Sequence, residues 1–484
     1  MAELPMTQMV ERDIVYENGE RVAAEEGLMW VPENRNVENS RKIPVHFVRV
    51  KAENPTLPPQ FYMPGGPGGH FSASNSDEDP LSNNWFKMIL EVSGGKRDVV
   101  FVNQRGNLNV PLSTALNVHI PQRSLSTTTP TQNEADITAK AILEAQTHYT
   151  SKGNDLAGYD IKHLVDDVDA VRQVLGYEKI AFYTLSFGSQ WSFSYIATYP
   201  AHVDRAVLFG VEPLDHAYDS PAYLDLAVAR VLSEADNSPA AQCMKPEGGF
   251  LASVKRSKEK LNKNPKSVTV VNEDGEQSSV LVTGDAFINM IKGLETGEGY
   301  LRSRSAAIPK LVAEVERGEY DNLAKAILAS RSPNNAHMIW ALIDNSLGIS
   351  KERDRKLKQE AKTALVGELN ATYRATRNIT ETKKVSDDFR AFKSIDVPIL
   401  MVQGDIDFST PYENAVEQLP YLENGALLTV RGGTHVVAYD LWEENNPGYD
   451  IIRTFLTADA EDLPKGEFTA TLAPLDFTTG DLCQ

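Results

Sequence analysis

Apolar residues along this chain fall into two patterns that alternate over much of its length. Short runs of consecutive apolar residues are typical of strands that are buried on both faces of a sheet. Such runs stand at 60–63, 98–103, 180–184, 205–211, 397–404 and 426–433. Between some of these runs, apolar residues recur every three or four positions, which predicts amphipathic helices. The alternation predicts an α/β protein with a mostly parallel central sheet flanked by helices.

Two other segments predict antiparallel hairpins. Residues 12–23 roughly alternate between polar and apolar positions around Asn18-Gly19, which is a two-residue turn signal. Residues 43–50 also alternate between polar and apolar positions, which predicts a further strand. Within residues 266–284, Asp274-Gly275 predicts a second small hairpin.

The pattern changes between about residues 212 and 394, where strand signals become scarce. Apolar residues at helical spacing over 308–315 predict an amphipathic helix that ends at Gly318. The charge run 350–362 predicts the solvated face of a helix capped by Ser350. We therefore expect two core segments, 1–211 and 395–484, with 212–394 as a mostly helical cap.

Charge and hydropathy exclude several kinds of partner. The net charge is −19, so the chain repels phosphate backbones and nucleic acid is not an expected partner. The apolar runs are far shorter than the roughly 18 residues that span a bilayer, so no membrane span is predicted. The first residues, MAELPMTQMVERD, lack the apolar segment of a secretory signal, which predicts a cytoplasmic location. The sequence leaves a homo-oligomer open.

Cys243 and Cys483 are the only cysteines. Two cysteines exclude a disulfide-rich scaffold, and without a Cys-x-x-Cys pair we expect neither a metal site nor a cofactor. In a reducing cytoplasm both are expected to be free thiols, and a single long-range disulfide is the alternative.

Candidate catalytic residues follow four of the predicted strands. These loops hold the glycine-rich segment PGGPGGH at 64–70, Ser186, Asp407 and His435. Because the carboxyl ends of parallel strands meet at one edge of a sheet, all four can converge there. A helix over 161–175, capped by Asp160, precedes Ser186, and a helix from about residue 190 follows it. This is the strand–turn–helix context of a nucleophile elbow.

Each candidate has a chemical role. A serine hydroxyl needs an imidazole to take its proton, which predicts Ser186 as nucleophile and His435 as base. A carboxylate must orient the imidazole, and we assign Asp407, with Asp405 as the rival. Backbone N–H groups of Phe187 and Gly66 are the expected oxyanion donors. The order Ser, Asp, His is that of the α/β hydrolases.

Other candidates are weaker. Thr184 stands where the elbow pattern Gly-x-Ser-x-Gly has its first glycine, which we interpret as a tolerated departure. Gly65 and His70 are expected to line the substrate pocket. Acidic residues at 166, 167 and 169 could suggest a metal site, but helical spacing favours the exposed face of a helix.

The chain resembles the prolyl aminopeptidase and tripeptidyl aminopeptidase branch of the α/β-hydrolase superfamily over nearly its whole length. The resemblance rests on GGPGG, NQRG (103–106), LVDDVDAVRQVLG, YPAHVDRAVLFGV, QGDIDFSTP and GGTHV. It implies an α/β-hydrolase fold with a cap, a triad of Ser186, Asp407 and His435, and oxyanion donors at Gly66 and Phe187. Asn103 departs from the aspartate usual before Gln-Arg-Gly.

Two functions follow from these residues and the resemblance. The first is a serine hydrolase of a carboxylic ester or lactone of an apolar small molecule, because the branch also resembles intracellular esterases and bacterial zearalenone lactonases. The alternative is an aminopeptidase, with Glu212 and Asp215 as candidates to bind the ammonium group of a peptide. A non-catalytic binding protein is a third hypothesis, which the complete set of triad residues disfavours.

Overall fold

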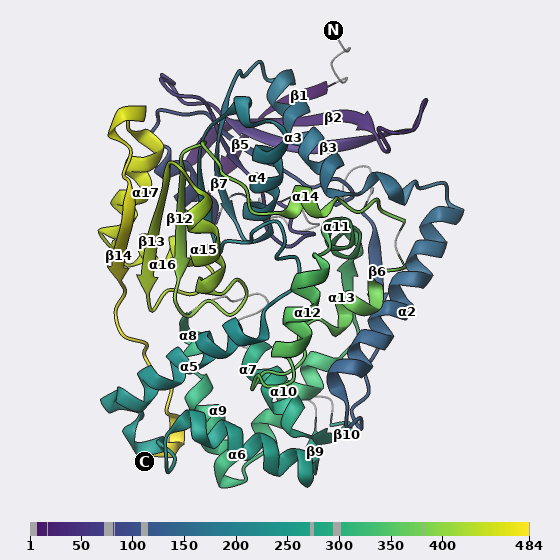
Figure 1. The fold of residues 1–484 in the computed structure, drawn as a ribbon, viewed down its shortest axis with the longest axis vertical. Helices are drawn as coiled ribbons and strands as arrows, with labels where there is room; N and C mark the ends of the chain where they lie inside the picture. Colours follow the sequence, from purple (N-terminus) through teal and green to yellow (C-terminus); the bar gives the residue numbers. More distant parts are fainter. Residues whose placement is uncertain are drawn as a thin grey trace.

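The computed structural model describes residues 7–16, 18–71, 81, 83–107, 115–271, 275–293, 302–379 and 381–483. A sheet with flanking helices forms one part of the molecule. A mostly helical layer, the cap, lies across the end of the sheet towards which the parallel strands run (Figure 1).

Ten strands within the described residues form the central sheet. Their spatial order is β1 (Thr7–Val15), β2 (Arg21–Pro32), β3 (Lys42–Val50), β5 (Val99–Val102), β4 (Gln60–Tyr62), β7 (Ile180–Leu185), β8 (Val203–Phe209), β12 (Ile399–Gly404), β13 (Gly425–Arg431) and β14 (Gly466–Thr471). The pairs from β1 to β5 are antiparallel, and those from β5 to β14 are parallel. The predicted mostly parallel sheet is confirmed. Strand β14 was not predicted, because most of its residues are exposed and it carries no apolar run.

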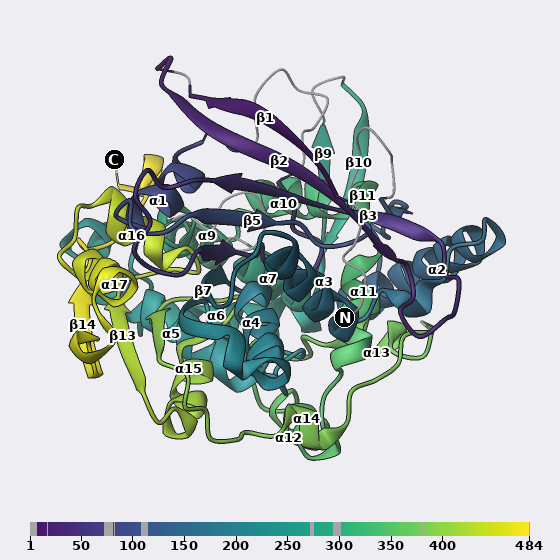
Figure 2. The same ribbon diagram turned by 90° about the horizontal axis from the view of Figure 1, so that it is seen from above.

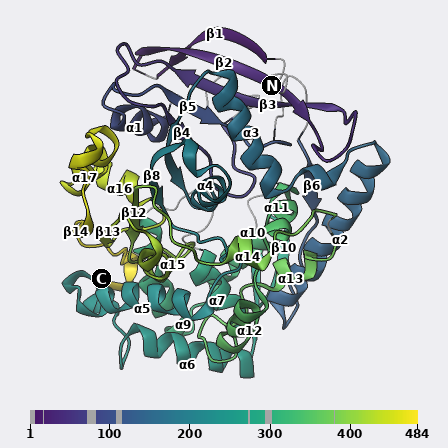
Figure 3. The same cartoon turned by 45° about the horizontal axis from the view of Figure 1, so that its top comes forward.

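Helices cover both faces of the sheet, as the continuous apolar runs require. The flanking helices are α1 (Asn84–Val92), α3 (Ile161–Val174), α4 (Phe187–Thr198), α15 (Tyr412–Gln418), α16 (Val437–Glu443) and α17 (Gly448–Thr457) (Figure 3). Alternate residues of one strand enter different cores. Phe182 packs in the cluster that contains α3 and α4, and Tyr183 packs in the cluster that contains α1, α16 and α17. Every residue of β7 is therefore buried.

The cap contains most of the remaining helices. They are α5 (Pro221–Asn237), α6 (Phe250–Lys263), α7 (Gly284–Gly293), α8 (Arg302–Ser305), α9 (Ile308–Arg317), α10 (Asp321–Arg331), α11 (Ile339–Leu347), α12 (Lys351–Glu360), α13 (Ala371–Thr376) and α14 (Asp387–Arg390). A segment from before the elbow joins them. Helix α2 (Pro130–Ser151) packs on α13, and β6 (Asn117–Ile120) pairs with β11 (Asn334–His337). Among the helices of the described residues, none has both the length and the apolar character of a membrane span.

Several elements predicted from local signals are present in the structure. Strands β1 and β2 form the first hairpin, which reaches past β3 at the edge of the sheet (Figure 2). Strands β9 (Lys266–Val271) and β10 (Gln277–Val282) form the second, although Asp274 lies outside the described residues. The side chains of Asp160 and Ser350 each cap a helix by accepting an N–H of the first turn. Helix α4 begins at Phe187, three residues earlier than predicted.

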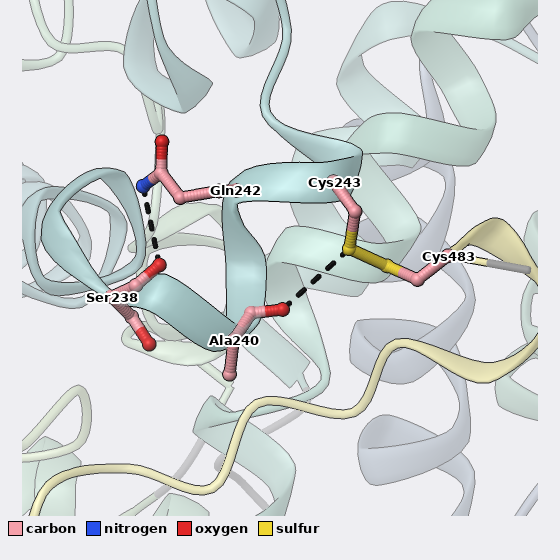
Figure 4. Close-up of a disulfide and its surroundings, with 5 residues drawn as sticks. All are labelled: Ser238, Ala240, Gln242, Cys243 and Cys483. Atoms are coloured by element: carbon pink, nitrogen blue, oxygen red, sulfur yellow. Dashed lines mark hydrogen bonds between the residues drawn. A yellow bond between two sulfur atoms is a disulfide. The ribbon is translucent and has the colours of Figure 1, made fainter.

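The expectation of two free thiols is wrong, because Cys243 and Cys483 form a disulfide in the structure (Figure 4). After β14 the C-terminal segment returns to the cap, where Leu475 and Phe477 are buried in its core. This return brings the two Cα atoms to 5.3 Å across a sequence separation of 240. Disulfides are rare in a reducing cytoplasm, so the bond weighs against the predicted location.

Candidate active site

Ser186 occupies a strained turn between β7 and α4. Its φ is 61°, a left-handed value that is uncommon for a residue with a side chain. The turn is held because the Ser186 N–H donates to the Phe209 carbonyl at 2.9 Å. A Cβ at Gly188 would lie 2.5 Å from the Met63 carbonyl oxygen, so only glycine fits there. These are the features of a nucleophile elbow with its serine at the tip.

Thr184 fits the elbow without a glycine. The same Cβ at Gly188 would lie 3.2 Å from the Thr184 Cβ, so the absence of a side chain at 188 leaves room for the threonine. The Thr184 hydroxyl is buried and lies 2.9 Å from the Ser192 hydroxyl in α4. This hydrogen bond satisfies the buried polar group and ties the strand to the helix.

Asp407 is the acid that contacts His435. The His435 Nδ1 lies 3.0 Å and 3.1 Å from the two Asp407 carboxylate oxygens. The rival, Asp405, instead accepts the Gly432 N–H. Asp407 also accepts hydrogen bonds from the N–H groups of Ser409 and Thr410, the Thr410 hydroxyl and the Gln403 amide. These four donors fix the orientation of the Asp407 carboxylate towards the imidazole.

The residues at the end of β8 contact both the Asp407–His435 pair and the elbow at Ser186. A Cβ at Gly210 would lie 2.8 Å from the His435 Cε1, so the imidazole packs directly on this glycine. The preceding residue, Phe209, holds the Ser186 N–H, and the Ser189 hydroxyl donates to the Gly210 carbonyl. Ser186, Asp407 and His435 are therefore gathered at one edge of the sheet, as the topology predicts.

The glycine-rich loop lies against the serine. A Cβ at Gly65 would lie 3.1 Å from the Ser186 Cβ and 3.6 Å from its hydroxyl oxygen. Gly66 has a φ of 112°, which favours glycine, and a Cβ there would meet the Gly68 nitrogen at 2.6 Å. Phe187 is the first residue of α4, where backbone N–H groups lack intrahelical partners. Gly66 and Phe187 remain the predicted oxyanion donors.

Gln104 braces this loop, a role that the sequence analysis missed. Its amide oxygen accepts the Gly68 N–H at 2.8 Å, and its nitrogen donates to the carbonyls of Pro64 and Gly65. The side chain is buried, so water does not compete for these bonds. The only signal for Gln104 in the sequence was its place in the motif NQRG, which was noted as part of the family resemblance.

The rest of that motif is structural. Asn103, the departure from aspartate, accepts the Phe71 N–H and lies 2.9 Å from the His46 Nδ1. Arg105 is buried and forms two hydrogen bonds to Asp167. The prediction that the acids at 166–169 lie on an exposed helix face is wrong for Asp167 and Asp169, which are buried. Arg105, which lies far from Asp167 in the sequence, compensates the charge of Asp167, and Arg172, one turn further along the same helix, compensates that of Asp169. Helical spacing does not reveal a distant partner such as Arg105.

His70 lies beside the loop but is exposed. Its ring packs edge-on against that of His337 in β11, with centroids 5.0 Å apart. Its predicted place in the substrate pocket stays a prediction.

Three carboxyl groups interact electrostatically with one another, and two of them also interact with Asp407 of the candidate triad. Glu212 follows β8, and its N–H donates to the Ser189 hydroxyl in α4. Burial raises the pKa of Glu212 well above its usual range, and the charges of Asp219, Asp344 and Asp407 raise it further. Burial and Asp219 likewise raise the pKa of Asp344, and burial raises the pKa of Asp219 to about 6. We call Glu212, Asp219 and Asp344 the acid group.

No hydrogen bond or ion pair to the carboxylates of the acid group occurs within the described part of the chain. Asp215, the other predicted ammonium ligand, has partners. It accepts from the N–H and hydroxyl of Ser350 at 2.6 Å and lies 3.5 Å from Arg390. Asp215 therefore anchors the start of α12, whereas Asp219 and Asp344 are the acids whose charges act on Glu212.

Asp219 also lines a cavity of about 650 Å³ in the cap. Tyr373 and Trp340 contribute aromatic rings to its wall, 6.0 Å apart and edge to face. Tyr373 stacks in turn on Tyr218, at 5.3 Å between centroids. The cavity thus combines an aromatic wall with the edge of the acid group.

Comparisons with known proteins found a family model and solved structures to which the chain is similar. A family model described as "TAP-like protein" matches residues 372–462. No curated protein matches the chain. Similar solved structures include an epoxide hydrolase from an endophytic Streptomyces, 12% identical over 96% of this chain and 99% of that one, with a TM-score of 0.37. Esterase E22 is 13% identical over 94% and 100%, with a TM-score of 0.37.

A meta-cleavage product hydrolase from Pseudomonas fluorescens is 12% identical over 85% of this chain and 94% of that chain, with a TM-score of 0.36. TM-scores this low do not bear on the roles of the site residues. The strand order, the elbow at Ser186 and the acid–histidine pair that follows it in the chain give this protein the α/β-hydrolase fold.

Proposed function

We propose that the protein is a serine hydrolase that forms an acyl-enzyme on Ser186, and that its substrates carry a free ammonium group, as those of an aminopeptidase do. The acid group carries this proposal. Three carboxyl groups without a cationic partner in the described residues disfavour an anionic ligand and stabilise a cation. Perturbed carboxyl groups beside a nucleophile are typical of functional sites. The match to a TAP-like family model supports the same choice.

The proposed reaction begins at the scissile carbonyl. His435 takes the Ser186 proton as the hydroxyl oxygen attacks the carbonyl carbon, and Asp407 stabilises the imidazolium. The N–H groups of Gly66 and Phe187 stabilise the oxyanion, each contributing about 3 kcal/mol to the barrier reduction. His435 then donates the proton to the leaving amine. Water, deprotonated by the same imidazole, releases the acyl group from Ser186.

A hydrolase of an ester or lactone of an apolar small molecule, such as zearalenone, is the second candidate. It uses the same steps, with an alcohol as the leaving group. The aromatic cavity wall formed by Trp340 and Tyr373 favours it, because these rings suit an apolar acyl chain. The acid group disfavours it, since an apolar ligand leaves buried carboxylates without compensation.

One assay separates the two candidates. Purified protein is offered alanyl-, prolyl- and tripeptidyl-nitroanilides, nitrophenyl esters and a macrolactone. We expect kcat/KM for a free-amine anilide to exceed that of its N-acetylated form by at least about 100-fold. Equal turnover of both forms, or turnover of the esters and lactone alone, would establish the second candidate instead. A fluorophosphonate that fails to label Ser186 would refute both.

A further inference from the structure

Lys292 forms no ion pair within the described residues of this strongly acidic protein. It stands in the last turn of α7 and its side chain is only partly exposed. It forms no hydrogen bond and no ion pair with any residue that the structure describes, although the chain has 67 acidic residues. Burial lowers its pKa to about 8. A lysine in this position costs stability, so a structural role does not explain it.

Lys292 lines the same cap cavity as Asp219, together with Arg123 and Arg331. Both arginines are held in place by backbone carbonyls. Arg123 donates to the Ser332 carbonyl at 3.0 Å, and Arg331 donates to the Ser124 carbonyl at 2.8 Å. Carbonyl partners fix these guanidinium groups without cancelling their charge. One part of the cavity wall is therefore cationic.

The acids of this cavity form no ion pair with that part of the wall among the described residues, although the charge of Glu134 opposes the lowering of the Lys292 pKa by burial. Glu368 is committed to Arg374, which donates to it at 2.5 Å. Glu134 is exposed to solvent. Asp219 belongs to the acid group, and the charge of Lys292 lowers its pKa against the larger effect of burial. The cavity thus offers an ammonium site at Asp219 and a carboxylate site at Lys292.

We propose that Lys292 binds a carboxylate of the substrate, so that the enzyme selects short substrates with a positive and a negative end. The proposal rests on the proposed function, because the acid group must hold the ammonium end. A lysine binds a carboxylate as a compact charge with several donors, and the bond is stronger in a partly desolvated cavity. The carboxylate can belong to the C-terminus of a peptide or to an acidic side chain.

Two matched substrate pairs separate these sources. A tripeptide is compared with its C-terminal amide, and glutamyl-nitroanilide is compared with glutaminyl-nitroanilide. In one of the two pairs, we expect the substrate with the free carboxylate to have a kcat/KM at least about tenfold higher than its neutral partner. This is the effect expected of one hydrogen bond to a charged group. Lys292→Met should remove the preference, and Lys292→Arg should keep it. Lys325→Met, on the exposed face of α10, is the matched control and should change nothing.

The outcomes distinguish this inference from the proposed function. If the wild-type protein cleaves alanyl-nitroanilide but prefers neither acid, the carboxylate site is refuted and the aminopeptidase proposal stands. Persistence of the preference in Lys292→Met, with the variant folded by circular dichroism, also refutes it. If no free-amine anilide is cleaved, the proposed function itself fails.

Discussion

Replacing Asp219 with asparagine should make this protein more stable. Burial raises the pKa of Asp219 from 3.8 to about 6, and no described side chain donates a hydrogen bond to its carboxylate. A tenfold change in an equilibrium constant corresponds to about 1.4 kcal/mol, so ionised Asp219 costs the folded state up to about 3 kcal/mol. The neutral amide has nearly the same shape and avoids this cost.

The gain should depend on pH in a defined direction. Above about pH 6 Asp219 is ionised in both the folded and the unfolded chain, and the full cost is present. As pH falls from 6 towards 4, the folded chain binds the proton first, so the wild type regains stability and its difference from Asp219→Asn disappears. Loss of repulsion on Glu212 and Asp344 adds to the gain at neutral pH.

Equilibrium unfolding in urea at pH 7.5 and pH 4.5 measures this directly. We expect Asp219→Asn to raise the free energy of unfolding by about 1–3 kcal/mol at pH 7.5 and by little at pH 4.5. Glu259→Gln, at an exposed position of α6, is the control and should shift neither value. If the variant is destabilised at pH 7.5, or if the gain is equal at both pH values, ionised Asp219 does not destabilise the folded state as described. Substrate binding should weaken although stability rises: the KM of Asp219→Asn for free-amine anilides should be higher than that of the wild type.

Further predictions concern catalysis and the disulfide. Ser186→Ala and His435→Ala should each lower kcat by about 10⁴-fold or more with little change in melting temperature, and a variant that keeps most of its rate would remove that residue from the triad. Gln104→Ala should lower kcat about 10- to 100-fold with a smaller change in KM, because the loop that it braces carries Gly66; an unchanged kcat would contradict this. The double variant Cys243→Ser, Cys483→Ser should lose up to about 5 kcal/mol of stability, because the bond closes a loop of about 240 residues. A reductant should destabilise the wild type by the same amount and leave the variant unchanged.

Much of the fold could be predicted from the sequence, because the signals that specify it are local. Continuous apolar runs indicate strands covered on both faces, and this is how β7 and β12 lie. Caps at Asp160 and Ser350 act within one helical turn, so a short window of sequence contains all the chemistry. Ser186 was identified in the same way, from a strand, a turn and a helix in succession.

Only the tertiary structure decided which distant residues meet. It places Asp407 rather than Asp405 against His435, pairs Asp215 with Ser350, and buries Asp167 against Arg105. Strand β14 was missed because it carries no apolar run, and the disulfide stayed only an alternative because its two cysteines lie 240 residues apart in the sequence. Periodicity reports which face of an element is apolar, but a side chain's charge state depends on burial and on neighbours that other elements supply. The sequence alone therefore determined the scaffold and the position of the candidate nucleophile, whereas the acid group and the surroundings of Lys292, on which the proposed substrate depends, exist only in the folded chain.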